Sequence, residues 1–449
     1  MSTWERAAHK VRARLEQSPL IARGGLSFFV AVSAANISNF VFHVIVSRLL
    51  GPPGYGALGA LLNVLLVLSV PLGAVQAAVT QRVAEQPDGR ARVLGLMLRG
   101  AAIGVTGAVA VIIVSPAVAG FLHLDSVAAV AVLAVWLVPA VIGALLQGVL
   151  IGQLRFKAVA VATVVGTVAG RLAFGIFLVG AGMGVVGAVA ATVLGQALTC
   201  LLLAWVLRRE LRMRGTSGVD LAWRDTLRSV LALSGYWAFA GIDTVLVRHF
   251  LPPREAGWYA AAATAARIAL FLPGAVTTVV FPRFAATQGR GPVSRRILGV
   301  SLAVVGGLGL VAAAVIAVLP RLVIRVLFGS SFGSGAAVVG TLAVAAACLG
   351  LVGLLTYYHL ARRSMLAQLG WAGAASAGVG IGLIHAHLEP VALVMLVVTG
   401  AILGLSLLGV AHGSMARGRG FLWTAAVGAY RAPAGRRASW PASSTSPRR

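Results

Sequence analysis

The sequence predicts an all-α membrane protein of about 12 transmembrane helices, in two six-helix lobes that are related by an internal repeat and surround a central cavity. Three observations predict this fold. The chain of 449 residues is 59% hydrophobic and only 11% charged. Apolar stretches of membrane-spanning length recur along it, and its two halves share sequence patterns. Such an apolar composition excludes an ordinary soluble domain.

Each apolar stretch is long enough to cross a bilayer, since about 20 helical residues at roughly 1.5 Å rise cover the ~30 Å hydrocarbon core. Segments that are polar, charged or rich in glycine and proline separate the stretches and mark the turns. The predicted spans lie near residues 24–46, 55–81, 93–114, 126–151, 156–180, 183–207, 229–250, 256–282, 297–319, 335–361, 365–384 and 390–411.

Basic residues alternate between the segments that join these spans. Lys and Arg number 37 against 11 acidic residues, a net charge of +26, and most of them occupy every second segment, including both ends of the chain. The positive-inside rule therefore predicts a multi-pass protein of a bacterial inner membrane with both termini in the cytoplasm. Anionic lipids at the cytoplasmic surface account for the charge, so no nucleic-acid partner is predicted. The opposite segments hold only Arg48, Arg248, Arg254, Arg321 and Arg325.

Two segments about 200 residues apart carry matching patterns, which indicates a duplicated unit. PLGAVQAAVTQRVA at residues 71–84 aligns with LPGAVTTVVFPRFA at residues 272–285. Upstream of these, SRLLGPPGYGA at residues 47–57 is similar to VRHFLPPREAGWYA at residues 247–260.

The repeat and the charge runs divide the chain into five parts. The first is a cytoplasmic arm that either lies on the membrane as an amphipathic helix or is a flexible segment. Two lobes follow, joined by a charged cytoplasmic linker, and a basic, low-complexity tail that we expect to be disordered ends the chain. The predicted boundaries are 1–23 for the arm, 24–207 and 229–411 for the lobes, 208–228 for the linker and 412–449 for the tail.

Two arginines and one aspartate lie inside the apolar spans. A charge at that depth costs about 2.5 to 3.5 kcal/mol even on lenient insertion scales, so it normally faces an aqueous cavity or an opposite charge. We interpret Arg267 and Arg171 as substrate-binding residues and Asp243 as a site for a coupling ion, Na⁺ or H⁺. Two alternatives stay open. Arg171 reaches the membrane surface instead, or Asp243 is only the counter-charge of Arg267.

Further polar side chains are predicted to line the cavity. Asn36, Asn39 and His43 share one face of the first span, where they either meet sugar hydroxyls or hydrogen-bond to neighbouring helices. Tyr236 shares a face with Asp243 and is assigned to the same substrate site.

The sequence contains no motif for an enzyme. A phosphate-binding P-loop is absent, as are GxSxG and HExxH patterns, so neither ATP hydrolysis nor membrane-enzyme chemistry is predicted. Cys200 and Cys348 both fall inside spans and are interpreted as small core residues. No metal site and no cofactor are predicted, apart from the coupling ion.

Three short patterns resemble the polysaccharide and oligosaccharide lipid flippases of the multidrug/oligosaccharidyl-lipid/polysaccharide (MOP) exporter superfamily. They are R-x-L-G-P-x-x-Y-G at residues 48–56, D-x-x-L-V at residues 243–247 and E-A-G-x-Y at residues 255–259. The resemblance covers residues 25 to 410. It implies two lobes that work by alternating access and an undecaprenyl-pyrophosphate-linked oligosaccharide as cargo, with possible partners in glycan polymerase machinery. It also implies that Arg267, in AARIALFLP, faces the cavity.

The chain departs from lipid II flippases, whose first spans are richer in charge, and this favours an exopolysaccharide or cell-wall glycan unit as cargo while leaving lipid II open. Two other functions remain open. A cation- or proton-coupled multidrug antiporter of the same superfamily has the same fold, but it is expected to line its cavity with more acidic residues. A glycan polymerase or ligase is expected to carry a long catalytic outer loop, and the outer segments here are short.

Overall fold

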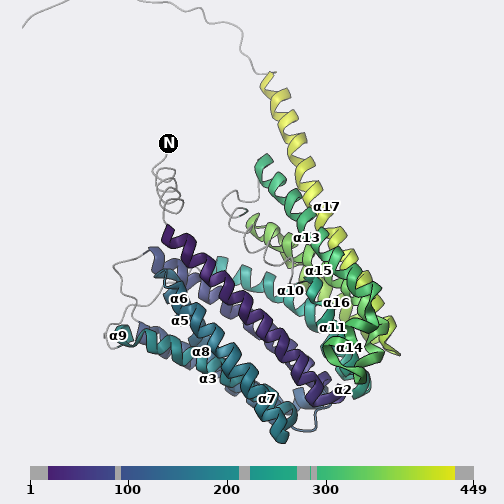
Figure 1. Cartoon of the computed structure of the whole chain (residues 1–449). Helices are drawn as coiled ribbons and strands as arrows, with labels where there is room; N and C mark the ends of the chain where they lie inside the picture. Colours follow the sequence, from purple (N-terminus) through teal and green to yellow (C-terminus); the bar gives the residue numbers. More distant parts are fainter. Residues whose placement is uncertain (1–18, 86–92, 212–222, 271–283, 285–290, 430–449) are drawn as a thin grey trace, which may run out of the picture.

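The structure is a computed structural model that describes residues 19–85, 93–211, 223–270, 284 and 291–429. Helices dominate these residues, and none of them forms a β-strand, as the sequence predicts (Figure 1). The predictions for most of the arm, the middle of the linker, the second half of the eighth span and the end of the tail lie outside the described residues.

The N-terminal lobe is built from the first half of the chain. Its helices are α2 (Pro19–Glu85), α3 (Val93–Phe121), α4 (Ala128–Val135), α5 (Leu137–Gly152), α6 (Phe156–Val165), η1 (Gly166–Ala173), α7 (Phe174–Leu178), η2 (Val179–Met183) and α8 (Gly184–Val206). The short helix α9 (Arg208–Leu211) begins the linker.

The C-terminal lobe follows the linker. Its described helices are α10 (Trp223–Phe250), α11 (Pro253–Ala266), α13 (Gly291–Val318), α14 (Pro320–Phe328), η3 (Ser330–Gly335), α15 (Ala336–Ala361), η4 (Met365–Gln368), α16 (Leu369–Leu383) and α17 (Leu388–Ala429).

Nine stretches of the described residues are long and apolar enough to cross a membrane, and two of them are long enough to cross twice. These two stretches contain 52 and 51 residues and cover residues 33–84 and 156–206. The first is interrupted at Gly51, where φ is 67° and ψ is 176°, a left-handed conformation that favours glycine. His43 and Tyr55 touch across this point, although twelve residues of straight helix would separate them by about 18 Å. The chain therefore folds back at Gly51.

The two lobes form a V. In Figure 1 they converge where α2, α7 and α14 are labelled and diverge toward the ends marked by α9 and by the extension of α17. The converging end holds the turn at Gly51 and the turn between α10 and α11, and it therefore carries the segments with few basic residues.

At the converging end the lobes approach to backbone contact. Gly56 of α2 lies against the backbone of Gly257 in α11, and a Cβ atom added to Gly257 would lie 1.8 Å from the carbonyl oxygen of Pro52. These glycines belong to the two equivalent proline-proline segments of the repeat. The two equivalent segments of the repeat thus meet each other where the lobes converge.

Gly257→Ala is expected to destabilise this contact. The new Cβ atom would overlap Pro52 backbone atoms, so the lobes must shift, and overpacking of this kind costs about 1 to 3 kcal/mol. We expect the melting temperature of the purified protein to fall by at least about 2 °C. Gly73→Ala is the matched control, because nothing lies within 4 Å of a Cβ atom added there. Equal melting temperatures for the two variants would contradict the close packing.

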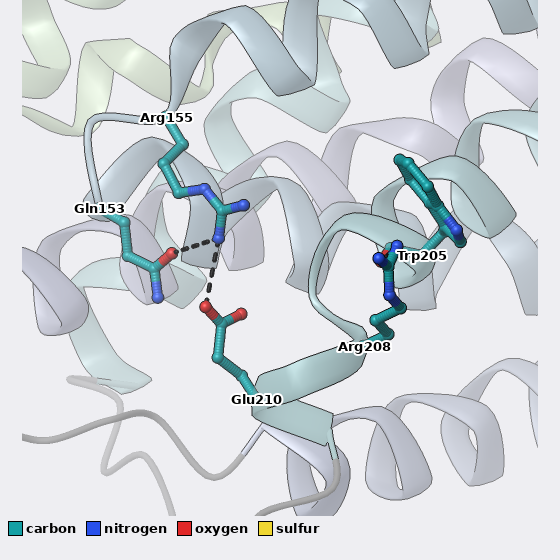
Figure 2. A network of polar contacts seen from close by, with 5 residues as sticks. All are labelled: Gln153, Arg155, Trp205, Arg208 and Glu210. Carbon is teal, nitrogen blue, oxygen red and sulfur yellow. Dashed lines mark hydrogen bonds and ion pairs between the residues drawn. The ribbon is translucent and has the colours of Figure 1, made fainter.

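The linker begins against the diverging end of the N-terminal lobe. Arg155, in the turn between α5 and α6, donates from Nη1 to Glu210 Oε1 of α9 at 3.2 Å and to Gln153 Oε1 at 3.5 Å (Figure 2). Arg208 lies over the ring of Trp205 at 4.5 Å (Figure 2). The Arg155–Glu210 pair is partly exposed, so its contribution to stability is about 1 kcal/mol or less. Its role is to fix where the linker starts.

The C-terminal end differs from the prediction in one respect. Helix α17 continues to Ala429, whereas residues 412–449 were expected to form a disordered tail. The physical reason is local composition, because FLWTAAVGA at residues 421–429 is apolar and rich in alanine, and proline first recurs at Pro433.

Candidate functional site

A chain of hydrogen bonds joins the two lobes near the middle of α2 and α11. His43 Nδ1 lies 3.0 Å from the hydroxyl of Tyr55, and that hydroxyl lies 3.0 Å from Oγ1 of Thr264 in the other lobe. Tyr55 is completely buried. A buried hydroxyl needs a hydrogen-bond partner. This chain of hydrogen bonds therefore forms only while the two lobes are in contact near Tyr55 and Thr264.

Arg267 lies at the C-terminal end of α11 and reaches across to the N-terminal lobe. Its Nη2 donates to Asn63 Oδ1 at 2.7 Å and to the carbonyl oxygen of Ala240 at 3.3 Å. Both acceptors are neutral. Among the described residues, no carboxylate lies within ion-pair distance of this guanidinium.

Asp243 is buried in α10, with only 5% of its surface exposed. Its Oδ2 accepts a hydrogen bond from Tyr259 at 2.9 Å, and its Oδ1 accepts from the backbone N–H of Thr244 at 2.7 Å. The expected alternative of a direct pair with Arg267 is not formed, although the Arg267 charge acts on the carboxylate from a distance. Uncharged donors therefore satisfy the carboxylate oxygens of Asp243.

Asp243 and Arg267 line the same small cavity inside the C-terminal lobe. Its interior is about 30 Å³, which is room for one or two water molecules or a single cation. The walls come from α10, α11, α15 and α17, and apart from Asp243, Arg267 and the hydroxyl of Thr399 in α17 the lining side chains are apolar.

Arg171 lies in the N-terminal lobe on η1, a stretch of π-helix of the kind that often marks functional sites. Its Nη1 donates to Asn39 Oδ1, and its guanidinium lies over the ring of Phe42 at 4.5 Å. The Nε atom is buried without a hydrogen-bond partner. The guanidinium is thus held between helices by neutral groups.

The two arginines flank the His43–Tyr55 pair. The charges of both Arg171 and Arg267 act on His43 and on Tyr55. Two cations from opposite lobes therefore lie near one buried polar chain, with amide, aromatic and carbonyl groups as their partners. Fixed guanidinium groups in low dielectric are suited to bind a phosphate or carboxylate.

The remaining predicted residues are distributed unevenly. Asn39 and His43 belong to the cluster just described, while Asn36 is exposed one turn before Asn39. Tyr236 is buried against α15, and its hydroxyl donates to the carbonyl oxygen of Leu349 at 3.3 Å. It does not contact Asp243; the phenol that does so is Tyr259.

Sequence reasoning missed four residues of the cluster, namely Tyr55, Asn63, Tyr259 and Thr264. The repeat contains a signal for two of them. Tyr55 and Tyr259 each follow a proline-proline pair within a few residues, and each hydrogen-bonds to a polar residue of the preceding helix.

Comparison with solved structures identifies the fold. The fold matches an inward-facing multidrug resistance MATE family transporter of the MOP superfamily with a TM-score of 0.68 and 15% identity, over 86% of this chain and 97% of that chain. An outward-facing MATE transporter matches with a TM-score of 0.58 and 18% identity, over 87% and 94%. A MOP transporter from Pyrococcus furiosus, described as having a binding pocket of reverse polarity, matches at 0.54 and 16%, over 87% and 94%. The chain therefore has the fold of a MOP superfamily transporter.

The family model for polysaccharide biosynthesis proteins matches residues 45–336. This match covers more than half of the chain, so the protein belongs to that family. No curated protein sequence matches this chain.

Proposed function

We propose that this protein flips a lipid-linked oligosaccharide, carried on undecaprenyl pyrophosphate, across the bacterial inner membrane by alternating access, for polysaccharide or cell-wall glycan biosynthesis. The protein acts as a transporter and not as an enzyme. One observation carries the proposal. Arg171 lies inside a membrane-spanning stretch of the N-terminal lobe and Arg267 lies at the end of α11 in the C-terminal lobe, and among the described residues neither forms an ion pair.

Two cations that form no ion pair among the described residues, in a low-dielectric site, favour an anionic cargo. A pyrophosphate offers several acceptor oxygens to the two guanidinium forks, while the amide groups of Asn39 and Asn63 are suited to sugar hydroxyls. A cationic drug would be repelled by the same pair. Membership of a polysaccharide biosynthesis family supports a glycan as the transported group.

Asp243 supplies the coupling site in this proposal. Na⁺ takes oxygen ligands, and the cavity offers the carboxylate of Asp243 and the hydroxyl of Thr399. A proton would occupy the carboxylate itself. Either event removes the negative charge that acts on Arg267 and leaves that guanidinium more attractive to the pyrophosphate. Cation occupancy and cargo binding are thereby linked.

The charge pattern indicates which end of the protein faces the cytoplasm. The positive-inside rule puts the diverging end in the cytoplasm, so this arrangement of lobes is the one that receives cargo from the inner leaflet. The higher TM-score against the inward-facing transporter supports the same orientation.

The cargo class is tested by ligand-induced stabilisation of the protein in nanodiscs. Undecaprenyl pyrophosphate is expected to raise the melting temperature, and undecaprenol, which lacks the phosphates, is expected to leave it unchanged. Ethidium serves as the cationic comparison. Stabilisation by ethidium without stabilisation by undecaprenyl pyrophosphate would favour a multidrug antiporter and overturn the proposal.

A further inference from the structure

Two arginines at equivalent positions of the repeat lie at the converging end of the lobes. Arg48 and Arg248 each precede a proline-proline pair by four positions. Each therefore occupies the end of the first membrane-spanning helix of its own lobe, immediately before the chain turns back. Neither belongs to the cluster around Arg171 and Arg267.

Arg248 binds the opposite lobe through two hydrogen bonds. Its Nε donates to the carbonyl oxygen of Leu122 at 2.9 Å, and its Nη2 donates to that of His123 at 2.8 Å. Only 5% of Arg248 is exposed, so the contact is sealed from solvent. The neighbouring His249 ring stacks on Phe121 with centroids 4.1 Å apart, and its Nδ1 lies 2.7 Å from the Phe121 carbonyl oxygen.

Arg48 makes the reciprocal contact from the N-terminal lobe. Its Nη2 donates to the carbonyl oxygen of Val326 in α14 at 2.5 Å. Helix α14 follows the third span of the C-terminal lobe, as residues 122–127 follow the third span of the N-terminal lobe. Each arginine thus binds the segment after the third span of the other lobe.

We propose that Arg48 and Arg248 form a two-fold related pair of latches that holds the outer end of the transporter closed. The acceptors are backbone carbonyl oxygens, so each latch is a charge-assisted hydrogen bond and not an ion pair. When the lobes separate at this end, water can solvate both guanidinium groups. Such latches favour the closed state by a moderate factor and still allow opening in each cycle.

Arg248 is expected to be the stronger latch for two physical reasons. Its guanidinium makes two hydrogen bonds in a buried site, whereas Arg48 is exposed and makes one. In addition, Asp125, on the loop that contains His123, places a negative charge near Arg248. The proposal rests on transport by alternating access, but it does not depend on the identity of the cargo.

The test measures the distance across the outer end by pulsed electron spin resonance in nanodiscs without cargo. Spin labels are attached at Val127→Cys and Ser334→Cys, which are exposed positions of opposite lobes, with Cys200 and Cys348 replaced by alanine. Arg248→Gln is expected to raise the ratio of long to short distances about ten-fold or more, and Arg48→Gln by a smaller factor. Arg248→Lys can reach only one of the two carbonyl oxygens. Its ratio of long to short distances is expected to lie between the ratios of Arg248→Gln and the wild type.

Arg254→Gln is the matched control, because Arg254 is exposed at the same end and lies over Trp258 of its own lobe. Distance distributions for Arg248→Gln and Arg48→Gln that equal the Arg254→Gln distribution would overturn the proposal. If Arg248→Gln does not reach the membrane, Arg248→Lys is compared with the Arg254→Gln control instead, because the Lys variant retains the charge. If the Gln variants shift the distances but the protein does not bind undecaprenyl pyrophosphate, the latch proposal stands and only the cargo assignment is refuted.

Discussion

Arg267→Ala is expected to abolish glycan export while the protein remains in the membrane. The substitution removes one of two cations from a buried site that offers an anion no other charged donor from the C-terminal lobe among the described residues. Truncation of a buried charged partner costs about 2 to 5 kcal/mol, which corresponds to a loss of roughly 30-fold or more in affinity for undecaprenyl pyrophosphate. Binding in nanodiscs and surface glycan in cells are the two measurements.

Membrane insertion should not fail in this variant, because removal of a charge from a span lowers the cost of insertion. Arg254→Ala, at the exposed start of the same helix, is the control and is expected to export glycan normally. Arg267→Lys retains a charge but loses the planar fork, so an intermediate affinity is expected. Full complementation by Arg267→Ala would exclude a role for this residue in cargo binding.

Asp243→Asn is expected to separate transport from cargo binding. The amide is neutral; its oxygen can accept from the backbone N–H of Thr244 while its NH₂ donates to the hydroxyl of Tyr259, so the fold around it is retained. It can neither release a proton nor balance the charge of Na⁺. Coupling between cation and cargo is then lost, and cation-driven flipping in proteoliposomes should fall by roughly 5- to 150-fold.

Binding should respond in the opposite direction in the same variant. Removal of the negative charge near Arg267 is expected to preserve or increase affinity for undecaprenyl pyrophosphate. Glu389→Gln, an exposed acid at the start of α17, is the control and should change neither quantity. Normal cation-dependent flipping by Asp243→Asn would show that the coupling site lies elsewhere.

The sequence was sufficient to predict the architecture because a membrane restricts the possible structures. Apolar spans must form helices, and alternating basic segments fix their direction, so the predicted spans in the described residues match the helices closely. The repeat also predicted that residues 47–57 and 247–260 are equivalent. Their contact through Gly56 and Gly257 follows from that symmetry.

The details of the site could not be read from the sequence, for three physical reasons. Asn63 accepts a hydrogen bond from Arg267 only because the two lobes are in contact near these residues. The sequence does not indicate which conformation of the two lobes is adopted. The π-helix that orients Arg171 has no simple residue pattern. Finally, Tyr236 and Tyr259 both come from spans near Asp243, and packing against α15 decides that Tyr236 points away.

Flipping by this protein can be measured as the leaflet distribution of lipid-linked oligosaccharides in cells that contain the protein, lack it, or carry Arg267→Ala. The measurement is the accessibility of the glycan to a membrane-impermeant sugar-modifying reagent added from outside. We expect the intermediate to accumulate on the inner leaflet in both the deletion strain and the Arg267→Ala strain. A normal distribution in the deletion strain, with no second flippase present, would contradict the proposed flipping.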